Sequence, residues 1–319
     1  MSDQIDLSKI NTFSINEMER KVDISSFPEL RESGTFTDFW NSLPDILAAK
    51  SLKTVCRRIA TAYNTQKKVL FLFGGHVIKT GCGLIIADLI KKGIINAVAV
   101  NGSVIIHDVE LAYFARTSED VQEGLEKGTF GMAKETAEMI NGAVKRNCES
   151  GYGESIKKLF RENPPSYSGV SLLSAVAEMD IPLTVHIAIG TDIIHQHPCF
   201  NGASVGEAST VDFKKLAKII SLLSHGVIVN IGSAVILPEV FLKALTVARN
   251  LGYKVEDFTA VNFDMIQHYR PNTNIVNRPT FSSGEGYSIT GHHEIMLPLL
   301  RMGILNEVKA GNKDGGYNG

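Results

Sequence analysis

The stretch Val69-Leu70-Phe71-Leu72-Phe73-Gly74-Gly75 decides the fold that we expect. Five apolar residues in a row, closed by two glycines, are typical of a strand that is buried on both faces of a parallel sheet. The sequence after it predicts a helix over 83–92, a second buried strand over 97–100 and a second helix over 104–115. Because strand–helix–strand crossovers are right-handed, these elements predict an α/β protein with a doubly wound, mostly parallel, Rossmann-like sheet.

The same alternation resumes further along the chain. Strands are expected over 183–188, 227–231 and 258–263, and helices over 39–63, 129–148, 212–223, 237–250 and 294–302. A loop rich in proline and glycine is expected over 270–286. We therefore expect an N-terminal arm over 1–35, a single α/β domain over 36–309 and a disordered, glycine-rich tail over 310–319. We find no internal repeat in the sequence.

Composition excludes several classes of protein. The 319 residues carry 32 Lys and Arg against 34 Asp and Glu, a net charge of -2 with His neutral, and the cations are scattered, so no nucleic-acid partner is expected. No apolar run approaches the ~20 residues that span a bilayer, and no secretory signal is visible. Four widely spaced cysteines without a CxxC pair fit reduced thiols. We expect a cytoplasmic protein without a membrane partner.

Glycine, serine and asparagine residues follow strand after strand at the expected carboxyl edge of the sheet. Ligands bind at this edge in open parallel sheets, because helix N-termini with unpaired amides converge there. A nucleotide phosphate suits such turns, although each turn also fits an ordinary bend or helix cap. Neither a P-loop nor a GxGxxG fingerprint is present. The turns contain Gly74, Gly75, Thr80, Gly81, Asn101, Gly102, Ser103, Gly232, Ser233, Asn262 and Asp264.

Histidines gather in the same turns or just beyond them. Six of the nine are found there: His76, His107, His195, His197, His292 and His293. Imidazole titrates near neutrality and is also the commonest metal ligand, so two interpretations are open. In one, the histidines transfer protons together with Asp192 or Glu239. In the other they bind a metal, and His195 and His197 point the same way if their segment is extended. Lys79 is a candidate cation for a phosphate or carboxylate, a Schiff-base nucleophile, or a plain surface lysine.

From about Val69 to Leu300 the order and content of these turns resemble deoxyhypusine synthase. The matching stretches are Ile78-Lys79-Thr80-Gly81 (its Ser-Ser-Gly turn), Ile181-Pro182-Leu183 leading into Thr191–His197 (its Ile-Pro-Val strand and Gly-Asp-Met-Ile-Tyr-Phe-His segment), Gly232–Ile236 (its Gly-Gly-Gly-Val-Val turn) and Gly291–Leu300 (its Ala-Asp-Ala-Ser and Phe-Pro-Leu-Leu segment). A shorter stretch, Asn101–Glu110 with Thr117-Ser118, resembles the NAD-containing domain of archaeal and cyanobacterial ornithine cyclodeaminases.

The resemblance implies a homo-oligomer, a dimer or tetramer, that binds NAD and acts on an amine. It makes Asp192 a candidate ligand for a substrate ammonium. It implies these NAD contacts: Thr80, Gly81, Gly102, Ser103, Gly232, Ser233 and Asn262. Three departures are plain. The family's catalytic lysine has no counterpart, since residues 270–290 contain no Lys; Leu237-Pro238-Glu239 stands where the family has Lys-His-His; and His292 replaces an Asp that holds the adenosine side of the cofactor. Deoxyhypusine synthesis itself is therefore not the expected reaction.

The expected function is that of an NAD-dependent enzyme acting on a polyamine or a diamino acid, by amine oxidation, transfer or cyclodeamination. Asp192 and Glu239 are expected to hold this small cationic amine or amino acid, with Lys79 as a reserve nucleophile. The expected proton carriers are His195, His197, His292 and His293. Two alternatives remain open: a metal-assisted hydrolase or lyase that uses the histidines, and a non-catalytic nucleotide-binding protein.

Overall fold

The structure is a computed structural model and describes residues 4–314 of the chain. The chain divides into two compact units, Met1–Lys50 and Ser51–Gly319. The predicted boundary after residue 35 falls inside the first unit, and the division between the units lies within the helix α2 (Leu47–Asn64). The segment predicted as a disordered tail lies partly in the last helix, α13 (His293–Asp314), and partly outside the described residues.

The first unit consists of short capped turns. Three 3-10 turns, η1 (Leu7–Lys9), η2 (Ile15–Glu17) and η3 (Ile24–Ser26), each follow a polar residue whose side chain accepts a hydrogen bond from the amide two residues later. An exposed apolar residue directly follows each capping residue, and a second lies four positions after the capping residue. These residues are Leu7, Ile10, Ile15, Met18, Ile24 and Phe27. The helix α1 (Phe36–Ser42) begins after Thr35, whose side chain accepts a hydrogen bond from the Asp38 amide three residues later.

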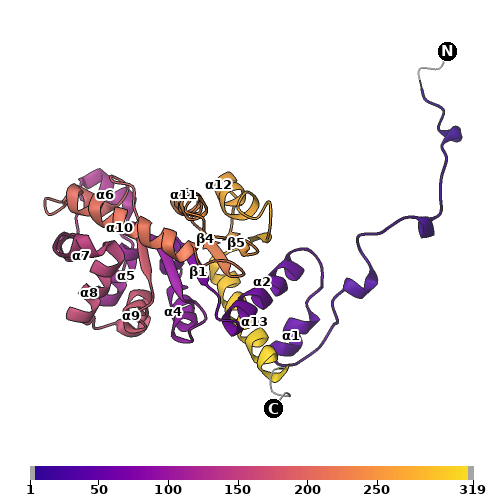
Figure 1. The fold of residues 1–319 in the computed structure, drawn as a ribbon, viewed down its shortest axis with the longest axis horizontal. Helices are drawn as coiled ribbons and strands as arrows, with labels where there is room; N and C mark the ends of the chain where they lie inside the picture. Colours follow the sequence, from indigo (N-terminus) through magenta and orange to yellow (C-terminus); the bar gives the residue numbers. More distant parts are fainter. Residues whose placement is uncertain (1–3, 315–319) are drawn as a thin grey trace. The chain divides into compact units, whose positions relative to one another are not determined.

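The second unit is built on one sheet of six parallel strands (Figure 1). The strands are β1 (Val69–Phe73), β2 (Ala97–Asn101), β3 (Leu183–His186), β4 (Val227–Ile231), β5 (Thr259–Asp264) and β6 (Glu285–Thr290). Their spatial order is β3-β2-β1-β4-β5-β6, and every neighbouring pair is parallel. This is the strand order of doubly wound, Rossmann-type sheets. The predicted fold class is confirmed.

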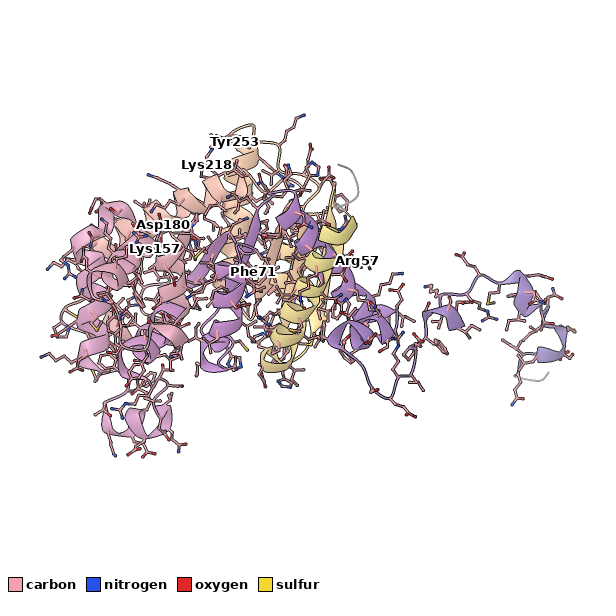
Figure 2. All side chains as sticks on the ribbon, turned by 90° about the horizontal axis from the view of Figure 1, so that it is seen from below. Arg57, Phe71, Lys157, Asp180, Lys218 and Tyr253 are labelled. Carbon is pink, nitrogen blue, oxygen red and sulfur yellow. The ribbon has the colours of Figure 1, made fainter. Side chains whose placement is uncertain are left out.

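Helices cover both faces of the sheet, as two-sided burial of its strands requires. On one face Leu70 and Leu72 of β1 join a core with α10 (Gly202–Ile220) and α11 (Ile236–Asn250). Phe71, labelled in Figure 2, alternates with them and is equally buried. On the opposite face α4 (Gly83–Lys91) contacts α9 (Leu172–Glu178) and α13. Further helices are α3 (His76–Lys79), α5 (Gly102–Phe114), α6 (Val121–Lys127), α7 (Lys134–Asn147), α8 (Tyr152–Glu162) and α12 (Tyr269–Pro271).

Several predicted elements have different bounds in the structure. The helix predicted over 212–223 begins ten residues earlier, where the Asn201 side chain caps α10 by accepting the Ser204 amide at 2.9 Å. Its first turns escaped prediction because small residues fill them and carry no apolar periodicity. The strand predicted over 183–188 ends at His186.

The loop predicted over 270–286 is wrong in part. It contains most of α12, the π-helix η7 (Asn272–Asn277) and the beginning of β6. β6 is an edge strand of which only Ile289 is buried, so it lacks the apolar run that announced the other strands. The helices α8 and α9 likewise lie where no element was predicted.

Ion pairs and cation–π contacts connect some of the helices to turns around the sheet. The Lys157 ammonium of α8 lies 2.7 Å from the Asp180 carboxylate, in the turn that leads into β3. The Lys218 ammonium of α10 lies 5.3 Å from the centre of the Tyr253 ring, which follows α11. Figure 2 labels all four residues. Among residues 4–314, no helix is both long and apolar enough to cross a membrane.

Candidate functional site

The winding of the sheet reverses between β1 and β4, whose carboxyl ends flank the crevice where doubly wound folds bind ligands. Gly74 follows β1 and Gly232 follows β4. Their backbones lie so close that a Cβ atom on Gly74 would be 3.4 Å from the Gly232 carbonyl oxygen. Gly232 has a φ of +63°, and a Cβ atom there would be 2.5 Å from the His293 ring. Conformation and space therefore both require glycine at 232.

His293 fills the crevice beside Gly232. The residue is 1% exposed, and among residues 4–314 neither ring nitrogen makes a hydrogen bond of good geometry, although the Phe263 backbone lies close enough to interact with the ring. Burial lowers the pKa of this imidazole and so favours its neutral form. The His76 ring lies 5.6 Å away, centroid to centroid, and the buried Asp264 carboxylate lies near enough to oppose the shift. A buried ring without a partner marks a position where a ligand atom can bind.

A pocket of about 280 Å³ opens beside the crevice, at the carboxyl ends of β1, β2 and β3. Its walls come from the turns after these strands, from α5 and from the segment before α6. Its titratable residues are Lys79, His107, Glu110, Glu119 and Asp192. A second pocket of about 330 Å³ adjoins it and shares Glu110 and Glu119. Three carboxylates face one ammonium in the first pocket, so its field favours a cationic ligand.

Asp192 contributes the deepest carboxylate of this pocket. Its side chain is 9% exposed, and its Oδ2 atom has no hydrogen-bond partner in the part of the chain that the structure describes. Burial raises the pKa of this carboxyl to about 6. Oδ2 lies directly over the first residue of α5, where a Cβ atom on Gly102 would be 2.0 Å away. Glycine at 102 therefore makes room for the carboxylate.

His195 is coupled to Asp192 through a 3-10 turn, η6 (Ile193–Gln196). The Asp192 amide donates to Nδ1 of His195 at 3.4 Å, and the His195 amide donates to the Asp192 carbonyl at 3.0 Å. The Nδ1 atom of His195 also accepts the Gly190 amide at 3.1 Å, so the neutral ring carries its proton on Nε2. Nε2 lies 3.8 Å from Asp192 Oδ2, beyond hydrogen-bond distance. Burial lowers the pKa of His195.

His195 and His197 were expected to point the same way only if their segment is extended, and this condition is not met, because His195 lies in the 3-10 turn η6 and His197 follows it. His197 turns away and donates from Nε2 to the Gly131 carbonyl at 2.7 Å. The histidines of this edge form separate groups, and among residues 4–314 no group of three or more His, Cys, Asp or Glu side chains is placed to hold a metal.

Two further predicted residues lie outside the pocket. Glu239, in the first turn of α11, pairs with Lys243, with Arg270 at 3.3 Å and with the Asn274 amide at 2.9 Å. The Lys243 contact is the main reason that the pKa of this carboxyl is lowered. The Glu239 carboxylate, which was expected to hold substrate, is thus already paired with cations of the protein itself. His292 is exposed at the start of α13, 3.9 Å from Glu294.

Several of the predicted cofactor residues bond within their own turns or strands. The pairs are Thr80 with His76, Asn101 with Ser103 and Val104, Ser233 with Leu237, Asn262 with Asn230 and Gln267, and Asp264 with Met265. Gly75 packs against Ser103, while Gly81 has open space where a Cβ atom would lie. These residues shape the carboxyl edge, and the fully buried Asn262 amide is satisfied on both sides.

Sequence reasoning missed the outer wall of the pocket. Thr117 and Glu119 belong to the irregular segment between α5 and α6, and Glu110 lies two turns into α5. The nearby motif His107-Asp108 gave a partial signal. Its aspartate, however, is fully buried and caps α9, where its two oxygens accept the Ser171 hydroxyl and the amides of Leu172 and Leu173.

Two long helices, α5 and α11, begin at this edge, and their first amides have no partner within the helix. Gly232 makes room for the His293 ring between them. Dinucleotides bind doubly wound sheets at this switch point.

No family model and no curated protein sequence matches the chain. The solved structures that are similar to it include the following three. A protein of Methanococcus maripaludis S2, assigned as LOR/SDH, matches with a TM-score of 0.52 and 15% identity over 82% of this chain and 70% of its own. AgrE, solved in complex with ornithine and NAD+, matches with a TM-score of 0.51 and 14% identity over 84% of this chain. A protein assigned as a deoxyhypusine synthase of Entamoeba histolytica has a TM-score of 0.48 and 10% identity over 90% of this chain and 96% of its own.

The chain spans 34% of the length of AgrE. At 14 to 15% identity, the two likenesses with TM-scores above 0.5 establish the fold and no more. At that level the predicted fold is confirmed: the chain shares its α/β fold with the LOR/SDH protein and with AgrE.

Proposed function

We propose that this chain is an NAD-dependent enzyme that oxidises or transfers the amine of a small cationic substrate, a polyamine or a diamino acid. The substrate occupies the 280 Å³ pocket beside the crevice. A pocket of this volume suits a molecule the size of an amino acid. The proteins of similar fold include AgrE, which was solved with ornithine and NAD+, and this supports the proposal without deciding the reaction.

The observation that carries the proposal is the unsatisfied oxygen of Asp192. A carboxylate whose Oδ2 atom lies buried, without a donor among residues 4–314, reduces stability unless a ligand supplies the donor. An ammonium group carries three donors and the opposite charge. Glu110 and Glu119 line the same pocket and add to the negative field that draws a cation inward.

NAD belongs in the adjoining crevice in this proposal. Gly74, Gly232 and the N-terminus of α11 would hold its pyrophosphate, and His293 would donate to it. When bound, NAD supplies the hydride acceptor for amine oxidation. The chain itself binds the amine through Asp192, orients it within the pocket and keeps Lys79 at the rim, where its ammonium can pair with a substrate carboxylate.

Calorimetry tests the proposal. We expect the purified chain to bind NAD+ or NADH and at least one of putrescine, spermidine, ornithine and lysine. Asp192→Asn should abolish amine binding and leave NAD binding intact. The matched control is Glu178→Gln, which removes an exposed carboxylate at the end of α9, paired with Lys91, and should change neither.

The outcomes separate the alternatives. Binding of NAD without any amine would favour the non-catalytic nucleotide-binding protein, whereas binding of neither would refute the proposal. Stoichiometric metal in the purified protein would favour the metal-assisted hydrolase or lyase. Light scattering tests the expected homo-oligomer.

A further inference from the structure

A chain of hydrogen bonds runs along the wall of the pocket from His107 to Glu110. The Nδ1 atom of His107 lies 2.7 Å from the Thr117 hydroxyl oxygen. The same hydroxyl donates to Glu110 Oε2 at 2.5 Å, and Thr136 donates to Glu110 Oε1 at 3.1 Å. Both oxygens of this carboxylate are therefore fixed, and they fix the threonine in turn.

The proton count along this chain settles the tautomer of His107. A threonine hydroxyl has one proton, and Glu110 receives it. The His107 ring must then donate from Nδ1, which leaves the lone pair of neutral imidazole on Nε2. Among the residues described, no hydrogen bond involves Nε2, and the side chain is 18% exposed where it lines the pocket. The pocket thus contains an unprotonated imidazole nitrogen with a fixed direction.

We propose that His107 Nε2 is the base that removes a proton from the substrate's ammonium group, with Thr117 and Glu110 as positioning residues. The proposal rests on the proposed function, since it requires an amine in the pocket. In the step, one N–H bond of the ammonium breaks and its electron pair stays on the substrate nitrogen. The Nε2 lone pair forms the new N–H bond. The positive charge moves to the imidazolium, which Glu110 stabilises through Thr117.

The surrounding charges couple this base to the substrate. Burial lowers the pKa of His107 to about 4, and the positive charge of Lys79 on α3 adds to the effect. Glu110 on its own helix, Glu119 before α6 and Asp192 after β3 face the same pocket. A substrate carboxylate that paired with Lys79 would remove one cause of the low pKa and make the base stronger. Among the proposed substrates this coupling favours a diamino acid, which carries both groups.

Nuclear magnetic resonance of histidine labelled with ¹⁵N and ¹³C tests the geometry without any substrate. We expect neutral His107 in the Nδ1–H tautomer, the form retained in Thr117→Ser and lost in Thr117→Val, where the ring has no acceptor for Nδ1–H. Lys79→Met should raise the pKa of His107. An Nε2–H tautomer in the wild-type protein would overturn the proposal, whatever ligand the pocket binds.

Kinetics with an amine identified by calorimetry tests the role. His107→Gln should lower kcat at least ~100-fold with KM within ~3-fold, as expected for loss of a general base. Thr117→Val should lower kcat by about 10-fold and shift its pH profile, and Thr117→Ser should restore both. Unchanged kcat in His107→Gln would overturn the role while leaving the proposed function intact. Failure of every amine to bind would instead refute the proposed function, and with it the role assigned to His107.

Discussion

Replacing Asp192 by Asn should make the protein more stable at neutral pH while removing its ligand site. The pKa of this carboxyl is about 6 in the folded chain against an ordinary 3.8. A raised carboxyl pKa means that the unfolded chain ionises first as pH rises, so stability falls between the two values. At ~1.36 kcal/mol per pKa unit, the penalty reaches about 3 kcal/mol well above pH 6. Asn does not ionise and has nearly the same size as Asp.

We therefore expect Asp192→Asn to raise the free energy of unfolding by about 2 to 3 kcal/mol at about pH 8, and by roughly half as much at about pH 5. Urea unfolding followed by circular dichroism measures both values. The matched control is Asp108→Asn. Burial raises the pKa of Asp108 to about 6 as well, but both of its oxygens accept hydrogen bonds. In the variant an NH2 group replaces one of these oxygens and cannot accept its hydrogen bonds. The free energy of unfolding should therefore fall by about 1 to 3 kcal/mol. An Asp192→Asn variant less stable than the wild type at both pH values would refute the reasoning.

Predictions at three other positions follow from the same structure. Gly232→Ala, which places a methyl group against His293 at a φ of +63°, should cost about 1 to 3 kcal/mol in urea unfolding and weaken NAD binding; unchanged values for both would contradict the crevice geometry. Burial lowers the pKa of His186 to about 4 from 6.5, so its contribution to the free energy of unfolding is present above pH 6.5 and is lost as pH falls toward 4. His186→Gln should flatten the dependence of the free energy of unfolding on pH over this range. An unaltered pH dependence would exclude His186 as its source. Lys157 is buried beside Glu154 and Asp180, so Lys157→Met should stay within about 1 kcal/mol of the wild type while Lys157→Ala loses more; equal thermal midpoints for the two variants would show that the lysine stem does not contribute.

The sequence predicted the parts of the fold in which local pattern and tertiary structure agree. β1, β2 and β4 lie at the centre of the sheet, where burial on both faces demands an uninterrupted apolar run. β6 lies at the edge with one buried side chain, and its alternating residues match no such pattern. The beginning of α10 depends on a cap at Asn201 and on small residues, which periodicity does not detect.

The candidate site was predictable in outline and not in detail. Sequence reasoning placed Lys79, Asp192 and Ser103 at the carboxyl edge, and all three line one pocket. It singled out Asp192 through the resemblance, but it could not show that Asp108 is satisfied by donors while Asp192 Oδ2 has none. It quoted Thr117 in a resemblance without a role, because that role comes from a hydrogen bond to a histidine ten residues earlier in the chain.

Glu110 belongs to both pockets, and this shared wall makes them thermodynamically linked. A cation bound in the 330 Å³ pocket partly neutralises the Glu110 carboxylate, which also attracts a cation to the 280 Å³ pocket. By thermodynamic linkage, if the first ligand lowers the affinity of the second by some factor, the second lowers the affinity of the first by the same factor. A second amine molecule would therefore act as an antagonist of the first without touching it, and the antagonism would weaken in Glu110→Gln.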